Sequence, residues 1–160
     1  MGRIIIAFLG VLFACAASAR MPEPMLLPVD REPLVLVSRD GSRTPFDVEI
    51  ADTNETRMRG LMFRTDFPQN RAMLFVMGIS RPIMMWMQNT PLPLDMVFLD
   101  AKGNITAIHE NAVPFSEAII SSGGPAAFVV ELNAGTARKI GLSVGGKALH
   151  RVICGACAAK

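Results

Sequence analysis

Two acidic residues stand inside apolar, strand-like segments, where a charged side chain is costly. Asp95 lies within LPLDMVFLD and Glu131 within FVVELNAG. Successive side chains of a strand point to opposite faces, so each acid shares its face with apolar neighbours and is predicted to be largely buried. A buried carboxylate must be hydrogen-bonded or paired with a cation, or its pKa rises and it takes up a proton.

Such a pair of acids could carry out general acid–base chemistry. With one pKa raised and the other ordinary, Asp95 and Glu131 would serve a hydrolase or a lyase. In the structural interpretation, each acid accepts backbone N–H groups or pairs with an arginine such as Arg64 or Arg71. Their separation along the chain says nothing about their distance in space, so the sequence leaves open whether the protein is an enzyme.

The segment WMQNTP supplies candidate ligand contacts. Trp86 is the single tryptophan of the chain and offers a large surface for stacking or packing. Asn89 and Thr90 precede Pro91, a pattern that usually ends a strand and begins a turn. Alternatively, their amide and hydroxyl groups lie at the rim of a pocket beside Trp86.

The methionines raise the question of a soft metal. Eight of the eleven lie between residues 58 and 96, and thioethers are suitable ligands for Cu(I). Strand alternation, however, places Trp86 on the face opposite Met85 and Met87, so this segment alone cannot complete a site. Methionine also fills irregular gaps in cores. We therefore expect core packing, with no metal site and no cofactor.

The N-terminus has the pattern of an export signal. Arg3, an apolar run over residues 4–14 and Ala17-Ser18-Ala19 predict a signal peptide over residues 1–19, cleaved after Ala19. The expected location is the periplasm or the exterior of the cell. An imperfect lipoprotein site at Cys15 is the alternative, and only lipidation there would attach the protein to a membrane.

Composition and the positions of the proline residues predict one globular domain. Hydrophobic residues make up 51% of the chain, which excludes a disordered protein, and no block of basic residues indicates a nucleic-acid surface. Residues 20–33 contain four prolines and are predicted to be a linker before a single β-rich domain over residues 34–153. In the tail, residues 154–160, Cys154 and Cys157 are spaced for a small disulfide. The oligomeric state is not determined.

Periodicity and turn residues predict a mainly β protein of about seven to nine short strands with two short helices, a β-sandwich or barrel with helical insertions. One helix begins near Asp52 and the other at Thr136. The expected strands are residues 34–38, 46–50, 72–77, 83–89, 94–99, 105–110, 126–132 and 148–153.

Several segments together resemble the family called domain of unknown function 192. The segments are RGLMFR, AMLF, WMQNTPLPLDMVFLD, GNITAI and VVELNAGTARKIGLSVGG, and the resemblance spans roughly residues 34–150. It implies a small, often exported, jelly-roll-like protein whose function is not established. Gln88 stands where the family usually has lysine, and Gly146 where aspartate is common. The matching residues are Gly60, Leu61, Met62, Arg64, Trp86, Met87, Asn89, Thr90, Pro93, Asp95, Asp100, Glu131, Ala134 and Gly135.

These observations favour a non-catalytic binding domain for a small or extended polar ligand, for example a glycan. The contacts would be Trp86, Asn89, Thr90, Asp95, Glu131 and Arg64. The alternatives are the acid–base enzyme described above and a structural or protein-partner module in which both acids only support the fold. If Asp95 and Glu131 lie in one cleft, a binding or a catalytic role is favoured. If each acid is buried with its own separate partners, neither role is favoured.

Overall fold

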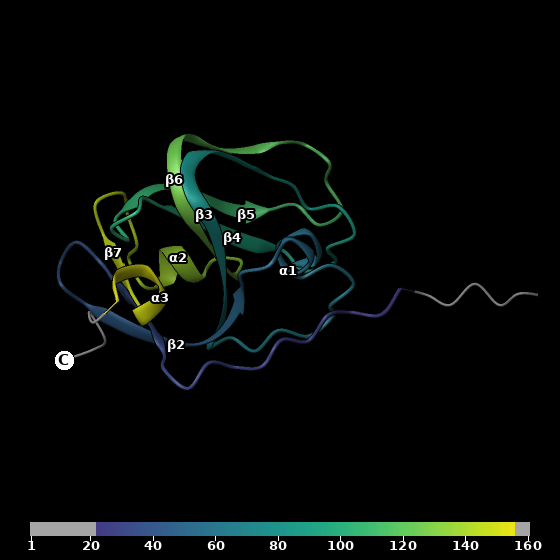
Figure 1. Cartoon of the computed structure of the whole chain (residues 1–160), viewed down its shortest axis with the longest axis horizontal. Helices are drawn as coiled ribbons and strands as arrows, with labels where there is room; N and C mark the ends of the chain where they lie inside the picture. The colour runs from purple at the N-terminus through teal and green to yellow at the C-terminus, as the bar shows by residue number, and fades with distance from the viewer. Residues whose placement is uncertain (1–21, 156–160) are drawn as a thin grey trace, which may run out of the picture.

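The computed structural model describes residues 22–155, which form seven strands and three short helices (Figure 1). The prediction of a mainly β protein is confirmed. In chain order the elements are β1 (Leu34–Val37), β2 (Arg43–Ala51), α1 (Asn54–Arg59), β3 (Arg71–Met85), β4 (Leu94–Leu99), β5 (Ile105–Ala112), β6 (Ile120–Asn133), α2 (Thr136–Lys139), β7 (Lys147–Leu149) and α3 (Arg151–Cys154).

One mixed sheet contains all seven strands, in the order β5-β4-β6-β3-β2-β1-β7. Neighbouring strands are antiparallel except β2 and β3, which are parallel. A parallel pair needs a long crossover, and α1 with residues 60–70 provides it. The longest pairing joins β3 and β6, which lie side by side across the front of the molecule in Figure 1.

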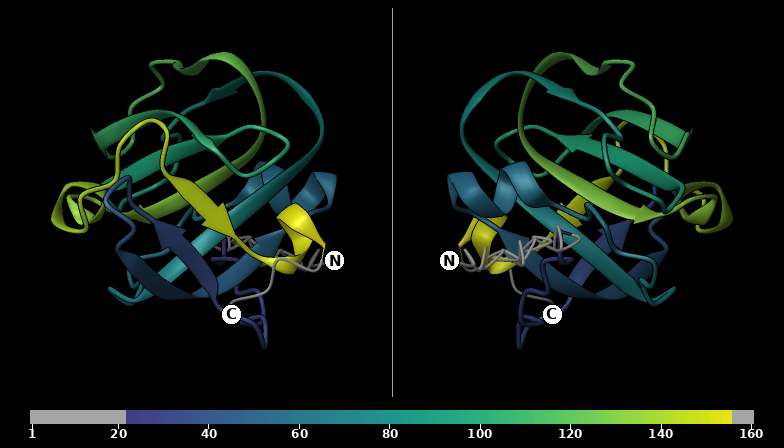
Figure 2. Two further views of the ribbon diagram at one scale, coloured as in Figure 1. Left: turned by 90° about the vertical axis from the view of Figure 1, so that its left-hand side faces the viewer. Right: turned by 90° about the vertical axis from the view of Figure 1, so that its right-hand side faces the viewer.

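The sheet is curled until its two edges approach each other. Asn104, just before β5, forms an isolated bridge with Lys147 of β7, and the Ile105 N–H donates to the carbonyl oxygen of Gly146 at 2.9 Å. The twist of adjacent strands accumulates across a seven-stranded sheet and produces this curvature. Figure 2 shows the strands curving around a common interior, so the architecture is a half-barrel.

Each face of the sheet carries its own apolar core. The first, which we call the α2 face, packs against Ala137 of α2 and Ile153 of α3. The second, which we call the methionine-rich face, is covered by Leu61 and Phe67 from the crossover. Strand alternation assigns each residue to one face. The buried methionines of the methionine-rich face are Met73, Met87 and Met96.

The segment preceding β1 lies against the domain. Met25 and Leu27 pack on the methionine-rich core, and the Asp30 N–H donates to the carbonyl oxygen of Val48 at 2.7 Å. The predicted linker, as far as it is described, is therefore an extended segment in contact with the sheet. The predicted signal sequence, including Cys15, lies outside the described residues. Between residues 22 and 155, no helix is long and apolar enough to cross a membrane.

Three of the expected strands differ from the observed elements. Residues 72–77 and 83–89 were predicted as separate strands, but β3 runs without a break from Arg71 to Met85, because Gly78, at a φ of 79°, lies at a register shift rather than in a turn. The expected strand over residues 148–153 is wrong beyond Leu149. His150 accepts the Val152 N–H at 3.3 Å and thereby caps a third helix, α3.

The two expected helices form close to their predicted positions. Thr53 rather than Asp52 is the N-cap of α1, and it forms a reciprocal capping box with Thr56. Helix α2 begins at Thr136 as predicted. Cys154, at the end of α3, is disulfide-bonded, and its predicted partner Cys157 lies outside the described residues.

Candidate functional site

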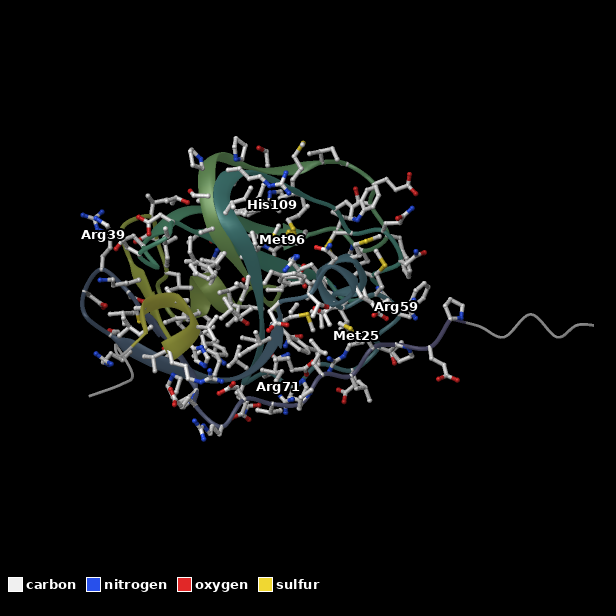
Figure 3. All side chains as sticks on the ribbon, viewed as in Figure 1. Met25, Arg39, Arg59, Arg71, Met96 and His109 are labelled. Carbon is white, nitrogen blue, oxygen red and sulfur yellow. The ribbon has the colours of Figure 1, made fainter. Side chains whose placement is uncertain are left out.

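A large open pocket lies between α1, the second half of β3 and the segment preceding β1. Its volume is about 1210 Å³, somewhat above the range of roughly 300–1,000 Å³ that is typical of small-molecule sites. Figure 3 shows Met25 and Arg59 of its wall close to α1. The lining residues are Glu23, Met25, Asn54, Glu55, Arg57, Met58, Arg59, Gly60, Leu61, Met62, Phe75, Met77, Arg81, Met84, Met85, Trp86, Gln88, Thr90 and Glu131.

The pocket exists because β2 is shorter than β3. Strand β2 pairs with β3 only as far as Ala51, opposite Phe75, so residues 76–85 of β3 have β6 as a neighbour on one side only. Helix α1 lies beyond this end, and Arg57 donates to the carbonyl oxygen of Val76 at 2.8 Å. Because the pocket runs along the edge of β3, side chains from both faces of the sheet reach it. Met84, Met85 and Trp86 therefore all line it, although strand alternation places Met85 on the face opposite Met84 and Trp86.

Glu131 is the buried acid of this pocket. It lies on the methionine-rich face of β6, opposite Met73 of β3 and Met96 of β4, and both methionines are fully buried. Its side chain is nine-tenths or more buried, and its Oε2 atom has no hydrogen-bond partner. Burial in these surroundings raises the pKa of Glu131 to about 8. The carboxyl group is therefore mainly protonated at neutral pH.

Asp95 lies on the opposite face of the sheet. On β4 it pairs with Leu132, whereas Glu131 pairs with Met96, so the two carboxyl groups point away from each other. Asp95 is fully buried on the α2 face. Its Oδ1 accepts the backbone N–H groups of Asn111 at 2.9 Å and Gly135 at 3.1 Å, and its Oδ2 accepts that of Ala137 at 2.8 Å. Asp95 thus joins β5 and the start of α2 to β4.

This arrangement gives no support to an acid–base pair. A general acid and a general base must both reach one substrate, directly or through one water molecule. Asp95 is enclosed, has both oxygens occupied by backbone donors and does not line the pocket.

Of the other predicted contacts, Trp86 and Thr90 line the pocket and Asn89 does not. Trp86 is 47% exposed. Thr90 is buried and donates its hydroxyl to the carbonyl oxygen of Gln88 at 3.2 Å. Asn89 is exposed in a left-handed conformation, with a φ of 56°, and its carbonyl oxygen accepts the Phe63 N–H at 2.7 Å. Its role in the structure is that of a turn residue.

Arg64 and Arg71 belong to a separate buried ion cluster. Both pair with Glu49 of β2, at 2.7 Å and 3.2 Å respectively. Glu49 is 1% exposed and Arg64 is 6% exposed. The Nε atoms of both arginines are buried without a hydrogen-bond partner. This cluster ties the crossover, through Arg64, to the sheet, and none of its members lines the pocket.

Glu49→Gln is expected to destabilise the fold by about 3 kcal/mol, because it leaves one buried and one partly buried guanidinium group, those of Arg64 and Arg71, without a counter-charge. The effect should be measured by chemical denaturation at pH 7. Glu117→Gln, at an exposed position, is the matched control and should change stability by less than about 0.5 kcal/mol. Equal stabilities of the two variants would contradict a role for Glu49 in holding the crossover.

Several pocket residues were not identified from the sequence. Met25 belongs to the predicted linker, and Phe75 reads as a core residue of a strand. Glu49, which lies outside the pocket, was also not identified. In FDVEI it shows the same signal as Asp95 and Glu131, an acid between apolar neighbours. The contribution of α1 could not be found, since it depends on where β2 ends against β3.

The pocket is rich in thioethers. Within residues 22–155, no three His, Cys, Asp or Glu side chains come together in an arrangement suited to a metal ion. Six methionines line the pocket beside Trp86, so thioethers are the donors that a soft metal would meet there. The six are Met25, Met58, Met62, Met77, Met84 and Met85.

Comparison with known proteins identifies the family of the chain. The family model DUF192, described as "Uncharacterized ACR, COG1430", matches residues 35–150. No curated protein matches the chain. Among solved structures, the crystal structure of a "putative transcription regulator" from Sinorhizobium meliloti 1021 is 44% identical with a TM-score of 0.76, covering 80% of this chain and 99% of that one.

A second crystal structure, of a protein of unknown function from Novosphingobium aromaticivorans DSM 12444, is 31% identical. Its TM-score is 0.72, and the match covers 88% of this chain and 99% of that one. The family match and both structures cover nearly the whole β-rich domain. The chain therefore belongs to the family of domain of unknown function 192.

Proposed function

We propose that the protein is a non-catalytic binding domain whose pocket takes a small ligand with a largely apolar body and one polar group that reaches Glu131. The observation that carries this proposal is the unpartnered Oε2 atom of Glu131, buried in a pocket of about 1210 Å³. A buried polar atom without a partner is costly in a folded protein, and a ligand that supplies the missing hydrogen bond offsets that cost.

The walls of the pocket support an apolar ligand body rather than the small or extended polar ligand, for example a glycan, that the sequence favours. Methionine side chains are unbranched and polarisable, and they adapt to ligands of different shape. Trp86 and Phe75 add aromatic surface. A glycan needs many hydrogen-bond partners, whereas Glu131 and Thr90 are the polar side chains that lie buried among the lining residues.

The same pocket brings together three of the segments through which the chain resembles its family. Gly60, Leu61 and Met62 come from RGLM, Trp86 and Thr90 from WMQNT, and Glu131 from VVELNAG. Gly60 leaves room for the aromatic floor, since a Cβ atom at this position would lie 3.1 Å from the ring of Phe75. The N-terminal pattern alone leads us to place this function in the periplasm or outside the cell.

Titration with 4-phenylbutanol, followed by tryptophan fluorescence, tests the proposal. Trp86 is the single tryptophan of the chain and lines the pocket, so its emission reports directly on occupancy. We expect a saturable change in emission. The Met62→Glu variant, which places a charge in the pocket wall, should weaken binding at least ten-fold.

Val144→Glu is the matched control, because Val144 is exposed and does not line the pocket. This variant should bind like the unmodified protein. An unsaturable response, or equal affinities of the Met62→Glu and Val144→Glu variants, would show that the pocket is not a binding site.

A further inference from the structure

We propose that the ligand of this pocket carries a cationic group on its apolar body, an alkylammonium or arylammonium, and that this group pairs with the carboxylate of Glu131. This inference rests on the proposed function and assigns the chemical class of the ligand. It depends on the charges around Glu131 and on the electronic character of the pocket wall.

Among the residues that the structure describes, none provides a counter-charge for Glu131. Burial is the cause that raises the pKa of this group, and no neighbouring cation of the described residues offsets it. The buried arginines Arg64 and Arg71 are paired with Glu49 instead. Ionised Glu131 would be a buried charge without a partner, which is strongly unfavourable. A cation carried by the ligand removes this penalty.

The wall of the pocket also favours a cation. The faces of aromatic rings are negative and attract ammonium groups, and Trp86 and Phe75 supply two such rings. Thioether sulfur is polarisable and electron-rich. The volume of the pocket accommodates an organic cation and far exceeds the space that one metal ion needs.

Two of the three arginines that line the pocket, Arg57 and Arg59, are turned toward the protein, and the third, Arg81, is exposed. Arg57 donates to the carbonyl oxygen of Val76 and to Oδ1 of Asn54. Arg59 donates to the carbonyl oxygen of Glu23, and its guanidinium lies 5.0 Å from the ring centroid of Phe63. Two acids of the lining, Glu23 and Glu55, further offset the positive charge at the mouth. A ligand cation can therefore pass the rim and meet Glu131 at the floor.

Three probes with the same phenylalkyl body and different charge test the inference by Trp86 fluorescence at pH 9: 4-phenylbutylammonium, which stays mainly charged at this pH, 4-phenylbutanol and 4-phenylbutyrate. We expect the ammonium to bind at least ten-fold more tightly than the alcohol, and the carboxylate to bind most weakly. The Glu131→Gln variant should lose the preference for the ammonium, so that its affinities for the ammonium and the alcohol differ less than two-fold. The Asp47→Asn variant, which removes an exposed acid outside the pocket, should keep the preference.

The outcomes separate the two proposals. If the alcohol binds and the ammonium binds no better, the cation inference fails and the binding pocket stands. If no probe binds, both fail. Silver(I), a redox-stable substitute for Cu(I), is a fourth probe. Tight silver binding that displaces the ammonium and is unaffected by Glu131→Gln would identify a thioether metal site and overturn the assignment of an organic cation.

Discussion

Replacing Asp95 with alanine is expected to lower the free energy of unfolding by about 5 kcal/mol. The substitution leaves three backbone N–H groups, those of Asn111, Gly135 and Ala137, without their acceptor. Each buried donor that loses its partner costs roughly 1–3 kcal/mol. Since typical domains are stable by only about 5–15 kcal/mol, this variant approaches the limit of folding.

Asp95→Asn is the milder test of the same contacts. The amide oxygen can keep the two donors that share Oδ1, but the amide nitrogen then faces the N–H of Ala137, which places two donors opposite each other. We expect a loss on the order of 3 kcal/mol. Chemical denaturation at pH 7 measures both variants.

Asp47→Asn is the matched control, because Asp47 is exposed on β2. It should change stability by less than about 0.5 kcal/mol. A loss below about 1 kcal/mol in both Asp95 variants would show that Asp95 does not hold β5 and α2 on the sheet.

The stability of the protein is expected to fall between about pH 4.5 and pH 8 because of Glu131. Its pKa is about 8 in the folded protein and 4.5 as the ordinary value. In this window the folded state holds a proton that the unfolded state has released, so raising the pH favours unfolding. The contribution is fully present below pH 4.5 and is lost as the pH rises through about 8. Since one pKa unit corresponds to about 1.4 kcal/mol, the full loss is on the order of 5 kcal/mol.

Glu131→Gln removes this dependence while preserving the shape of the side chain. Stability of the two proteins should be compared by denaturation at intervals from pH 5 to pH 9. The variant should gain stability relative to the unmodified protein as the pH rises, by about 4 kcal/mol over the range. A constant difference between the two curves would show that the pKa of Glu131 is not raised by burial.

The class of the fold was accessible from the sequence because strand alternation and turn residues are local signals. Strands β1, β4 and β5 follow such runs closely. The long β3 was not accessible, because the residues around Gly78 resemble a turn and only the pairing with β6 carries the strand through them. The short helix α3 was missed for a related reason, since its cap, His150, reads locally as part of a strand.

In the candidate site, too, some residues were identified from local signals, whereas the roles of others depend on distant segments. Trp86, Thr90 and Glu131 were identified by residue type and by the cost of burying an acid, and they meet in one pocket. Asp95 carried the same signal as Glu131 but serves the fold, because its three donors come from residues 16, 40 and 42 positions further along the chain. No local pattern reveals such partners.

The sequence by itself therefore determined a mainly β domain, its family and the presence of buried acids that need an explanation. The tertiary structure alone decided that both carboxylate oxygens of Asp95 have hydrogen-bond partners, whereas Oε2 of Glu131 has none. Strand alternation assigns each acid to a face, but the contents of that face are set by register and by the strand ends of distant segments. Because β2 ends at Ala51 and β3 continues, the methionines, Trp86 and Glu131 surround one pocket, while Asp95 is enclosed beneath α2 on the other side.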